Sequence, residues 1–150
     1  MHCRIFYKIF ILILSLSMSG CQSTSGRNGH TCSIYLESTD SSSIVKTLPI
    51  SKIDIPVIPV PILFSDGIAS AALVPRRCGM MLNISFTDRA AYELYHLSFD
   101  SIGRRLVLEY DGDIIGFSKI SDENIQNLTF IPEISDEACQ AFCRFINCRR

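Results

Sequence analysis

Apolar and polar residues change their spacing several times along the chain, and each change marks a different predicted element. Residues 9–16 are almost continuously apolar. From Cys32 to Glu37 the two kinds of residue alternate, which is typical of a short strand with Ile34 and Leu36 on one side. The same alternation over residues 82–86 predicts a half-buried strand.

Two later stretches have the spacing of amphipathic helices. The first is predicted to begin after a cap at Thr87 or Asp88 and to end before Gly103. The second is predicted to run from a cap at Ser135 or Asp136 through Ile146. Its apolar positions form one stripe at i, i+3, i+4 and i+7. They are Cys139, Phe142, Cys143 and Ile146.

Asp111 and Gly112 are the strongest local signal in the chain. They separate two strand-like runs, residues 104–110 and 113–120. A two-residue hairpin turn requires positive φ, and Asp-Gly accommodates it. With one more short strand at 128–131, the order from Met81 onward is strand, helix, strand, hairpin strand, strand, helix. This order predicts an α+β fold, a small antiparallel sheet with two helices packed on one face.

A proline-rich segment precedes that unit. Residues 48–64 contain prolines at positions 49, 56, 59 and 61. Proline lacks a backbone N–H donor, so the segment is predicted to be an extended edge or a polyproline-like strap. A proline-rich recognition peptide is the alternative, but the interleaved Ile and Val residues favour burial.

The N-terminus has the order of a secretory signal. Arg4 and Lys8 precede the apolar run, and small residues follow it up to Gly20. The run is too short to span a bilayer comfortably, because about 20 apolar residues are needed. Met18 to Cys21 resembles the bacterial lipobox, which implies cleavage after residue 20 and acylation, including palmitate, at Cys21. An ordinary secreted protein and an uncut membrane anchor remain alternatives.

A lipid on Cys21 places the chain in the cell envelope without a transmembrane helix. Gln22 stands where inner-membrane retention signals have Asp, so the resemblance implies the outer membrane, facing the periplasm. Residues 21–31 are rich in Ser and Gly and are predicted to be a flexible tether. Residues 32–150 are long enough for a single domain.

The charge balance argues against nucleic-acid binding. The predicted mature chain loses Arg4 and Lys8 but no acid, which leaves 12 basic and 15 acidic side chains and a formal net charge of −3. No basic stretch is interleaved with aromatic residues.

Five cysteines remain after the signal and Cys21 are set aside, an odd number for an oxidising compartment. They are Cys32, Cys78, Cys139, Cys143 and Cys148. Burial of Cys139 and Cys143 as small apolar side chains is favoured by their place in the helical stripe. A disulfide with a distant partner is the second interpretation. A metal site is the third, disfavoured because no Cys-x-x-Cys pair exists and the histidines are far off in sequence.

No arrangement of residues indicates catalysis. Glu109, Asp111 and Asp113 cluster around the predicted turn, where charged side chains are usually solvated. His96 has Glu93 on its own helix, but neighbours on one helix do not converge as nucleophile, base and orienting group. Phosphate-binding loops, nucleophile elbows and zinc signatures are missing from the sequence. We therefore expect no enzyme activity, cofactor, metal or small-molecule substrate.

Residues 61–146 resemble the head subdomain in the first periplasmic domain of the Sec translocon accessory proteins SecD and SecDF. The resemblance rests on PILFSDGIASAALV, on ISFTDRAAYELYHLSFDSIGRRLVLEYDGDIIG and on the closing ISDEACQAFCRFI. Its most specific part is Gly103 to Leu106 followed by Asp111 and Gly112. The chain departs from the family at Phe117-Ser118, where Ala-Pro is usual, and at residues 127–130, which lack the family's glycines.

The family's membrane-spanning helices, which couple proton flow to preprotein movement, have no counterpart in this sequence. The resemblance therefore implies a fold and a surface that contacts extended polypeptide, but no translocation motor. Two functions follow as hypotheses. One is a membrane-tethered module that binds polypeptide through a sheet edge or groove. The other is a structural subunit of a fixed envelope assembly.

Overall fold

This computed structural model describes the chain from residue 29 to 121 and from 126 to 149. The elements, in chain order, are β1 (Cys32–Leu36), β2 (Ile44–Thr47), β3 (Asp54–Val57), β4 (Leu63–Phe64), the 3-10 turn η1 (Ser65–Gly67), β5 (Ile68–Arg76), β6 (Gly79–Phe86), α2 (Asp88–Phe99), β7 (Arg105–Tyr110), β8 (Asp113–Lys119), β9 (Asn127–Pro132) and α3 (Asp136–Asn147).

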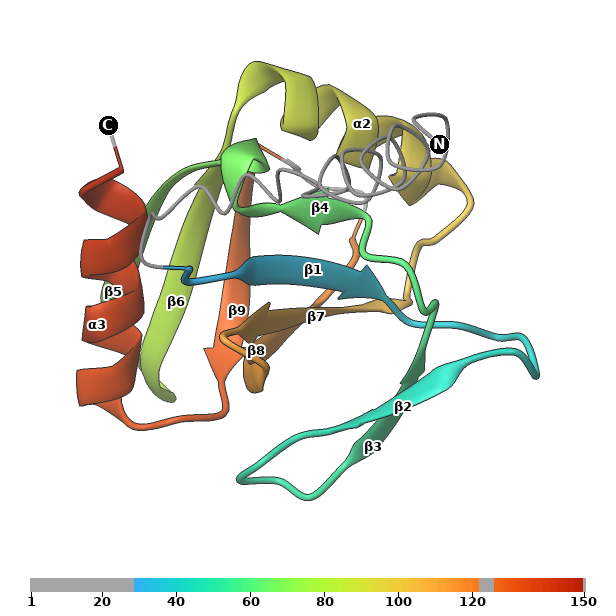
Figure 1. The fold of residues 1–150 in the computed structure, drawn as a ribbon, viewed down its shortest axis with the longest axis horizontal. Helices are drawn as coiled ribbons and strands as arrows, with labels where there is room; N and C mark the ends of the chain where they lie inside the picture. Colours follow the sequence, from blue (N-terminus) through green and yellow to red (C-terminus); the bar gives the residue numbers. More distant parts are fainter. Residues whose placement is uncertain (1–28, 122–125, 150) are drawn as a thin grey trace, which may run out of the picture.

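Seven of the strands form one antiparallel sheet in the order β4-β1-β7-β8-β9-β6-β5. Strand β9 joins two halves of this sheet. Its first residues pair with β6, and its last residues pair with β8, where Gly116 lies opposite Pro132 and Phe117 lies opposite Ile131. The strands of the two halves run in different directions, so the sheet is strongly curled (Figure 1).

Both helices pack on the same face of the sheet. Leu94 of α2 and Phe142 of α3 belong to one buried cluster, together with Ile34, Leu106 and Leu108 of the sheet. Thr87 and Ser135 cap the two helices. The hydroxyl of each accepts a hydrogen bond from the backbone N–H three residues later in the chain, at 3.3 Å and 3.4 Å. The predicted α+β class and the predicted helices are confirmed.

The opposite face of the sheet is covered by a hairpin of β2 and β3. Side chains alternate across a strand, so Tyr35, Val107 and Ile114 point away from the helices. They pack with Ile55 and Val57 of β3 and form a second core. The first half of the proline-rich segment therefore forms this hairpin, and its last residues, 56–58, also hydrogen-bond to residues 36–38 at the end of β1.

The segment 48–64 does not run straight, as a single strap would. Leu48 accepts a hydrogen bond from the Lys52 N–H and donates one to Ile53, and Lys52 has a φ of 58°. This turn folds residues 54–57 back onto residues 44–47, where Pro56 lies opposite Val45. The strand Ile44–Thr47 was not predicted, because a serine-rich run precedes it and its apolar residues do not alternate.

Glu133 fastens the hairpin turn to the main sheet. Its side chain accepts hydrogen bonds from the backbone N–H groups of Ile50 and Ser51, at 2.8 Å and 2.9 Å. Its own N–H donates to the Ile115 carbonyl at 2.9 Å. The residue is only 4% exposed, so the carboxylate replaces water as the partner of both turn donors.

Glu133→Ala should free the hairpin turn while the sheet stays folded. Loss of a charged acceptor leaves two donors without a partner, which is worth about 2 kcal/mol in the free energy of unfolding. Hydrogen exchange at Ile50 and Ser51 should become faster. Glu133→Gln keeps an acceptor oxygen, so its free energy of unfolding should fall by less. Unchanged exchange in the alanine variant would contradict the anchoring role.

Candidate functional site

The predicted site residues fall in two places. Cys21 lies outside the described residues, so lipid attachment stays a prediction. Asp111 and Gly112 form the turn between β7 and β8, with φ values of 52° and 88°, and Tyr110 lies opposite Asp113.

Asp111 also holds the first described residues of the chain. Its carboxylate accepts a hydrogen bond from the Thr31 N–H at 2.8 Å and lies 2.5 Å from Nδ1 of His30. Loss of water contact alone raises the pKa of Asp111, but the hydrogen bonds from His30 and Thr31 outweigh it and bring the pKa below its usual value. The turn therefore fixes the point at which the predicted tether meets the domain.

The five cysteines described by the structure are free thiols with very different surroundings. Cys32 and Cys139 are buried, Cys143 is half-buried, and Cys78 and Cys148 are exposed. Burial raises the pKa of Cys32 to about 12 and that of Cys139 to about 11. Cys139 thus lies in the core, as its helical stripe predicts.

Alkylation should separate these cysteines into two groups. At pH 8, iodoacetamide should label Cys78 and Cys148 of the native chain rapidly, because both are exposed. Cys32 and Cys139 should react only after denaturation, since the thiolate fraction falls about tenfold for each unit by which the pKa exceeds the pH. Mass spectrometry of labelled peptides measures this. Rapid native labelling of Cys139 would mean that α3 is not docked on the sheet.

The other candidate groups do not assemble into a reactive centre. His96 is exposed on α2 and contacts the rings of Tyr92 and Tyr95. Glu109 forms a salt bridge with Lys46, which belongs to the β2–β3 hairpin. Within residues 29–121 and 126–149, no three His, Cys, Asp or Glu side chains are placed to hold a metal ion. None of the helices in this part of the chain is long and apolar enough to cross a bilayer.

The two edges of the sheet differ in how they are protected. At the β5 edge, the side-chain amide of Asn147 accepts a hydrogen bond from the Ala71 N–H at 3.2 Å and donates one to the Ala71 carbonyl at 2.9 Å. The amide therefore takes the place of a neighbouring strand. Pro75 lies four residues further along β5 and has no N–H to donate.

At the other edge, β4 pairs only with β1, where Leu63 lies opposite Ile34. Ile62 donates to the Ile34 carbonyl at 2.8 Å. Ile34 directs its backbone groups toward β4, so those of its partner Leu63 face β1, and those of Phe64, opposite Ser33, face away from β1. This edge is not covered by another strand in the described part of the chain.

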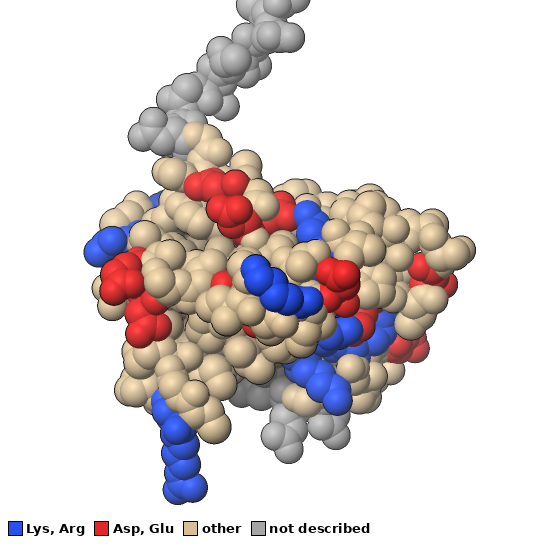
Figure 2. Space-filling model, turned by 90° about the horizontal axis from the view of Figure 1, so that it is seen from below, with Lys and Arg blue, Asp and Glu red and all other residues tan. Residues whose placement is uncertain are grey.

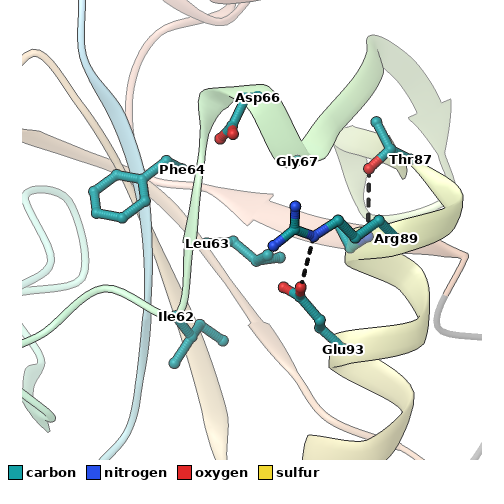
Figure 3. A pocket seen from close by; sticks show the side chains of 9 residues that line it. Ile62, Leu63, Phe64, Asp66, Gly67, Thr87, Arg89 and Glu93 are labelled. Atoms are coloured by element: carbon teal, nitrogen blue, oxygen red, sulfur yellow. Dashed lines mark hydrogen bonds and ion pairs between the residues drawn. The ribbon is translucent and has the colours of Figure 1, made fainter.

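A cleft of about 200 Å³ opens beside β4 (Figure 3). One wall consists of Ile62, Leu63 and Phe64, and Phe64 is 55% exposed. Across the cleft, the first turns of α2 present Arg89 and Glu93, which form an ion pair at 3.0 Å. Asp66, Gly67, Thr87 and Ala90 complete the lining. The cleft thus has an apolar wall beside an open strand edge and a polar wall on the other side. Such a cleft can bind a peptide in an extended conformation.

Asn147→Ala should make the β5 edge prone to pair with the same edge of a second copy. The variant leaves the N–H and carbonyl of Ala71 without their protein partners while removing little of the core, because Asn147 is exposed. We expect concentration-dependent self-association in analytical ultracentrifugation. Asn127→Ala removes the same side chain from the start of β9 and should remain at the wild-type molecular mass.

Charge does not mark a site on the face seen from below in Figure 2. Acidic and basic side chains alternate there over short distances, with uncharged surface between them. A mixed surface of this kind gives no long-range attraction for a highly charged ligand.

Comparison with known proteins finds similarity in structure but not in sequence families. The chain matches no protein-family model and no curated protein. A SecDF structure, described as a membrane component that enhances protein export, superposes with a TM-score of 0.59 at 15% identity, over 78% of this chain and 61% of that one. The chain has the fold of part of SecDF.

Two further SecDF structures agree. The super-membrane-facing form of SecDF gives a TM-score of 0.59 at 15% identity, over 78% of this chain and 18% of that one. SecDF from Thermus thermophilus, described as a translocon-associated membrane protein, gives 0.50 at 14% identity, over 81% and 19%. The chain thus spans less than two thirds of each SecDF chain. The expected likeness to SecDF is confirmed at the level of the fold.

The cleft beside β4 was not located from the sequence. Its two walls come from residues 62–67 and 87–93, which are separated in the chain by the whole β5–β6 hairpin. The one usable signal was Pro61 before a two-residue apolar strand, which marks an edge but not what faces it.

Proposed function

We propose that this chain is a membrane-tethered, non-enzymatic envelope protein that binds extended polypeptide in the cleft beside β4. The observation that carries the proposal is the open edge of β4 next to an apolar wall and the Arg89–Glu93 pair. The SecDF fold supports it, because SecDF is described as enhancing protein export.

The cleft would hold a chain by strand addition. The backbone of Phe64 would pair with the peptide, its ring would cover an apolar side chain, and Arg89 with Glu93 would face polar groups. Because β4 has only two residues, few backbone hydrogen bonds are available. Binding should therefore be weak, quickly reversible and tolerant of sequence, which suits a protein that handles many clients.

The location of the protein in the cell envelope is part of the same proposal. Cys21 would carry the lipid, and the domain would face the periplasm from the outer membrane. Cys21→Ser should abolish both labelled-palmitate incorporation and co-sedimentation with membranes. Retention of either property would contradict the anchor but not the cleft.

The binding proposal is tested by photo-crosslinking in living cells. A photoreactive amino acid is placed at Phe64 in the cleft and, as a control, at Lys119, which is exposed on β8. Mass spectrometry should find many exported polypeptides from position 64 and few from position 119. Equal yields from both positions would refute a specific binding cleft.

A fixed assembly subunit is the second candidate, and the β2–β3 hairpin favours it. Val45, Ile50 and Ile53 are 61%, 65% and 44% exposed, an apolar surface on an element that is already anchored. The same probe at Val45 distinguishes the two functions. One envelope protein, recovered at a constant ratio, would indicate a structural subunit.

A further inference from the structure

The outer side of α2 and the turn that follows it carry an exposed apolar surface, which we call the aromatic ridge. It consists of Tyr92, Tyr95, His96, Phe99 and Ile102. Tyr92, Tyr95, Phe99 and Ile102 are 65%, 52%, 60% and 60% exposed. The ring centroids of Tyr92 and His96 are 4.4 Å apart, and those of Tyr95 and Phe99 are 4.8 Å apart. Large side chains offer about 200 Å² each, so the ridge exposes roughly 500 Å², the size at which an apolar patch marks an interaction site.

We infer that the aromatic ridge rests in the lipid headgroup region of the membrane to which the chain is tethered. The inference depends on the lipid anchor of the proposed function. Tyrosine and histidine combine an apolar ring with a polar tip, and such rings are favoured where hydrocarbon meets water. Helix α2 lies at the outside of the molecule (Figure 1), and the exposed side of a helix is convex, which suits a broad, deformable surface better than a pocket on a protein.

The tether places the ridge within reach of that surface. Residues 22–28 separate Cys21 from the first described residue and span at most about 25 Å. The chain enters the domain at His30, whose ring is 5.3 Å from that of Phe145 on α3. The next residue of α3, Ile146, lines one hollow together with Thr87, the cap of α2. The tether thus meets the domain at the end where α2 begins, and α2 is only about 18 Å long.

The charges around the ridge define the kind of lipid. Arg89 is paired with Glu93, and Asp88 and Asp100 lie near the two ends of the helix. The helix carries no excess of basic residues. Docking should therefore depend on zwitterionic headgroups and apolar contact, with little dependence on anionic lipid or on salt.

The experiment uses the full lipidated chain in vesicles of phosphatidylethanolamine and phosphatidylcholine. The chain contains no tryptophan, so each introduced tryptophan is a unique fluorophore. Phe99→Trp reports on the ridge, and Val45→Trp, at a site with 61% exposure on β2, is the matched control. Brominated phosphatidylcholine should quench roughly half of the emission of Phe99→Trp and almost none of that of Val45→Trp, because contact with lipid is required. Adding Tyr92→Ser and Tyr95→Ser to Phe99→Trp should abolish most of the quenching.

Flotation of the vesicles separates the two proposals. A chain that floats while Phe99→Trp stays unquenched would overturn the ridge inference and leave the anchor intact. A chain that does not float would overturn both. Equal quenching at both sites would also overturn the inference, because the orientation would be random. An emission blue shift without quenching would place a second copy or a client polypeptide on the ridge, which contradicts lipid contact.

Discussion

Phe142→Ala should remove about 4 kcal/mol from the free energy of unfolding, the largest effect we expect from a single substitution. Phe142 is fully buried in the middle of α3 and packs edge-on against Tyr110 of β7, with ring centroids 5.3 Å apart. Its removal would leave a cavity between the helix and both halves of the sheet. Domains of this size are stable by about 5–15 kcal/mol, so a large share of the stability would be lost.

Urea unfolding followed by circular dichroism measures the effect. Phe99→Ala is the matched control, because the same side chain is 60% exposed there. That variant should stay within about 0.5 kcal/mol of wild type. Similar midpoints for the two variants would contradict the docking of α3. The pair also separates folding from function, since Phe99 belongs to the aromatic ridge and Phe142 does not.

Local signals in the sequence were sufficient for the elements after Met81. Periodicity identified α2 and α3, capping residues identified where they begin, and Asp111-Gly112 identified the β7–β8 turn. These signals succeed because each element has one buried face and one exposed face. Their spacing therefore reports burial directly.

The N-terminal half was harder to predict, because its contacts are made with distant parts of the chain. The turn at Ile50 is held by Glu133, and residue 71 is covered by Asn147. Neither partner can be inferred from the residues around it. The exposed aromatic residues of α2 were missed for another reason. Only apolar residues on the buried side were used to define the helix, so Tyr92 and Phe99 had no role in the prediction.

The cleft shows the same limit. Leu63 and Phe64 were expected only as part of an extended segment, and Arg89 only as a helix residue. Their meeting depends on the order of strands in the sheet, which places β4 at the edge beyond β1. Strand order is set by packing between distant segments. The spacing of residues within one segment therefore does not reveal it.

Gly116→Ala should destabilise the domain by about 3 kcal/mol, because the new methyl group has no room. A Cβ at this position would lie 2.8 Å from the Ile131 carbonyl oxygen, and that atom belongs to the backbone. The pairing of β8 with β9 consists of the residue pairs Gly116–Pro132 and Phe117–Ile131, and the hydrogen bond from the Glu133 N–H to the Ile115 carbonyl lies next to them. Relief of the clash therefore requires separation of the two halves of the sheet at their joint.

Gly112→Ala is the control, because it makes the same chemical change in open space at a φ of 88°. It should cost only about 1 kcal/mol of backbone strain, confined to the turn. Hydrogen exchange should distinguish the variants. In Gly116→Ala, the N–H of Glu133, which donates to Ile115 across the joint, should exchange faster, and the turn donors Ile50 and Ser51 should follow because Glu133 holds them. If Gly116→Ala were no less stable than Gly112→Ala, β9 would not close on β8. The curled sheet would then lack the joint that connects its β4 half to its β5 half.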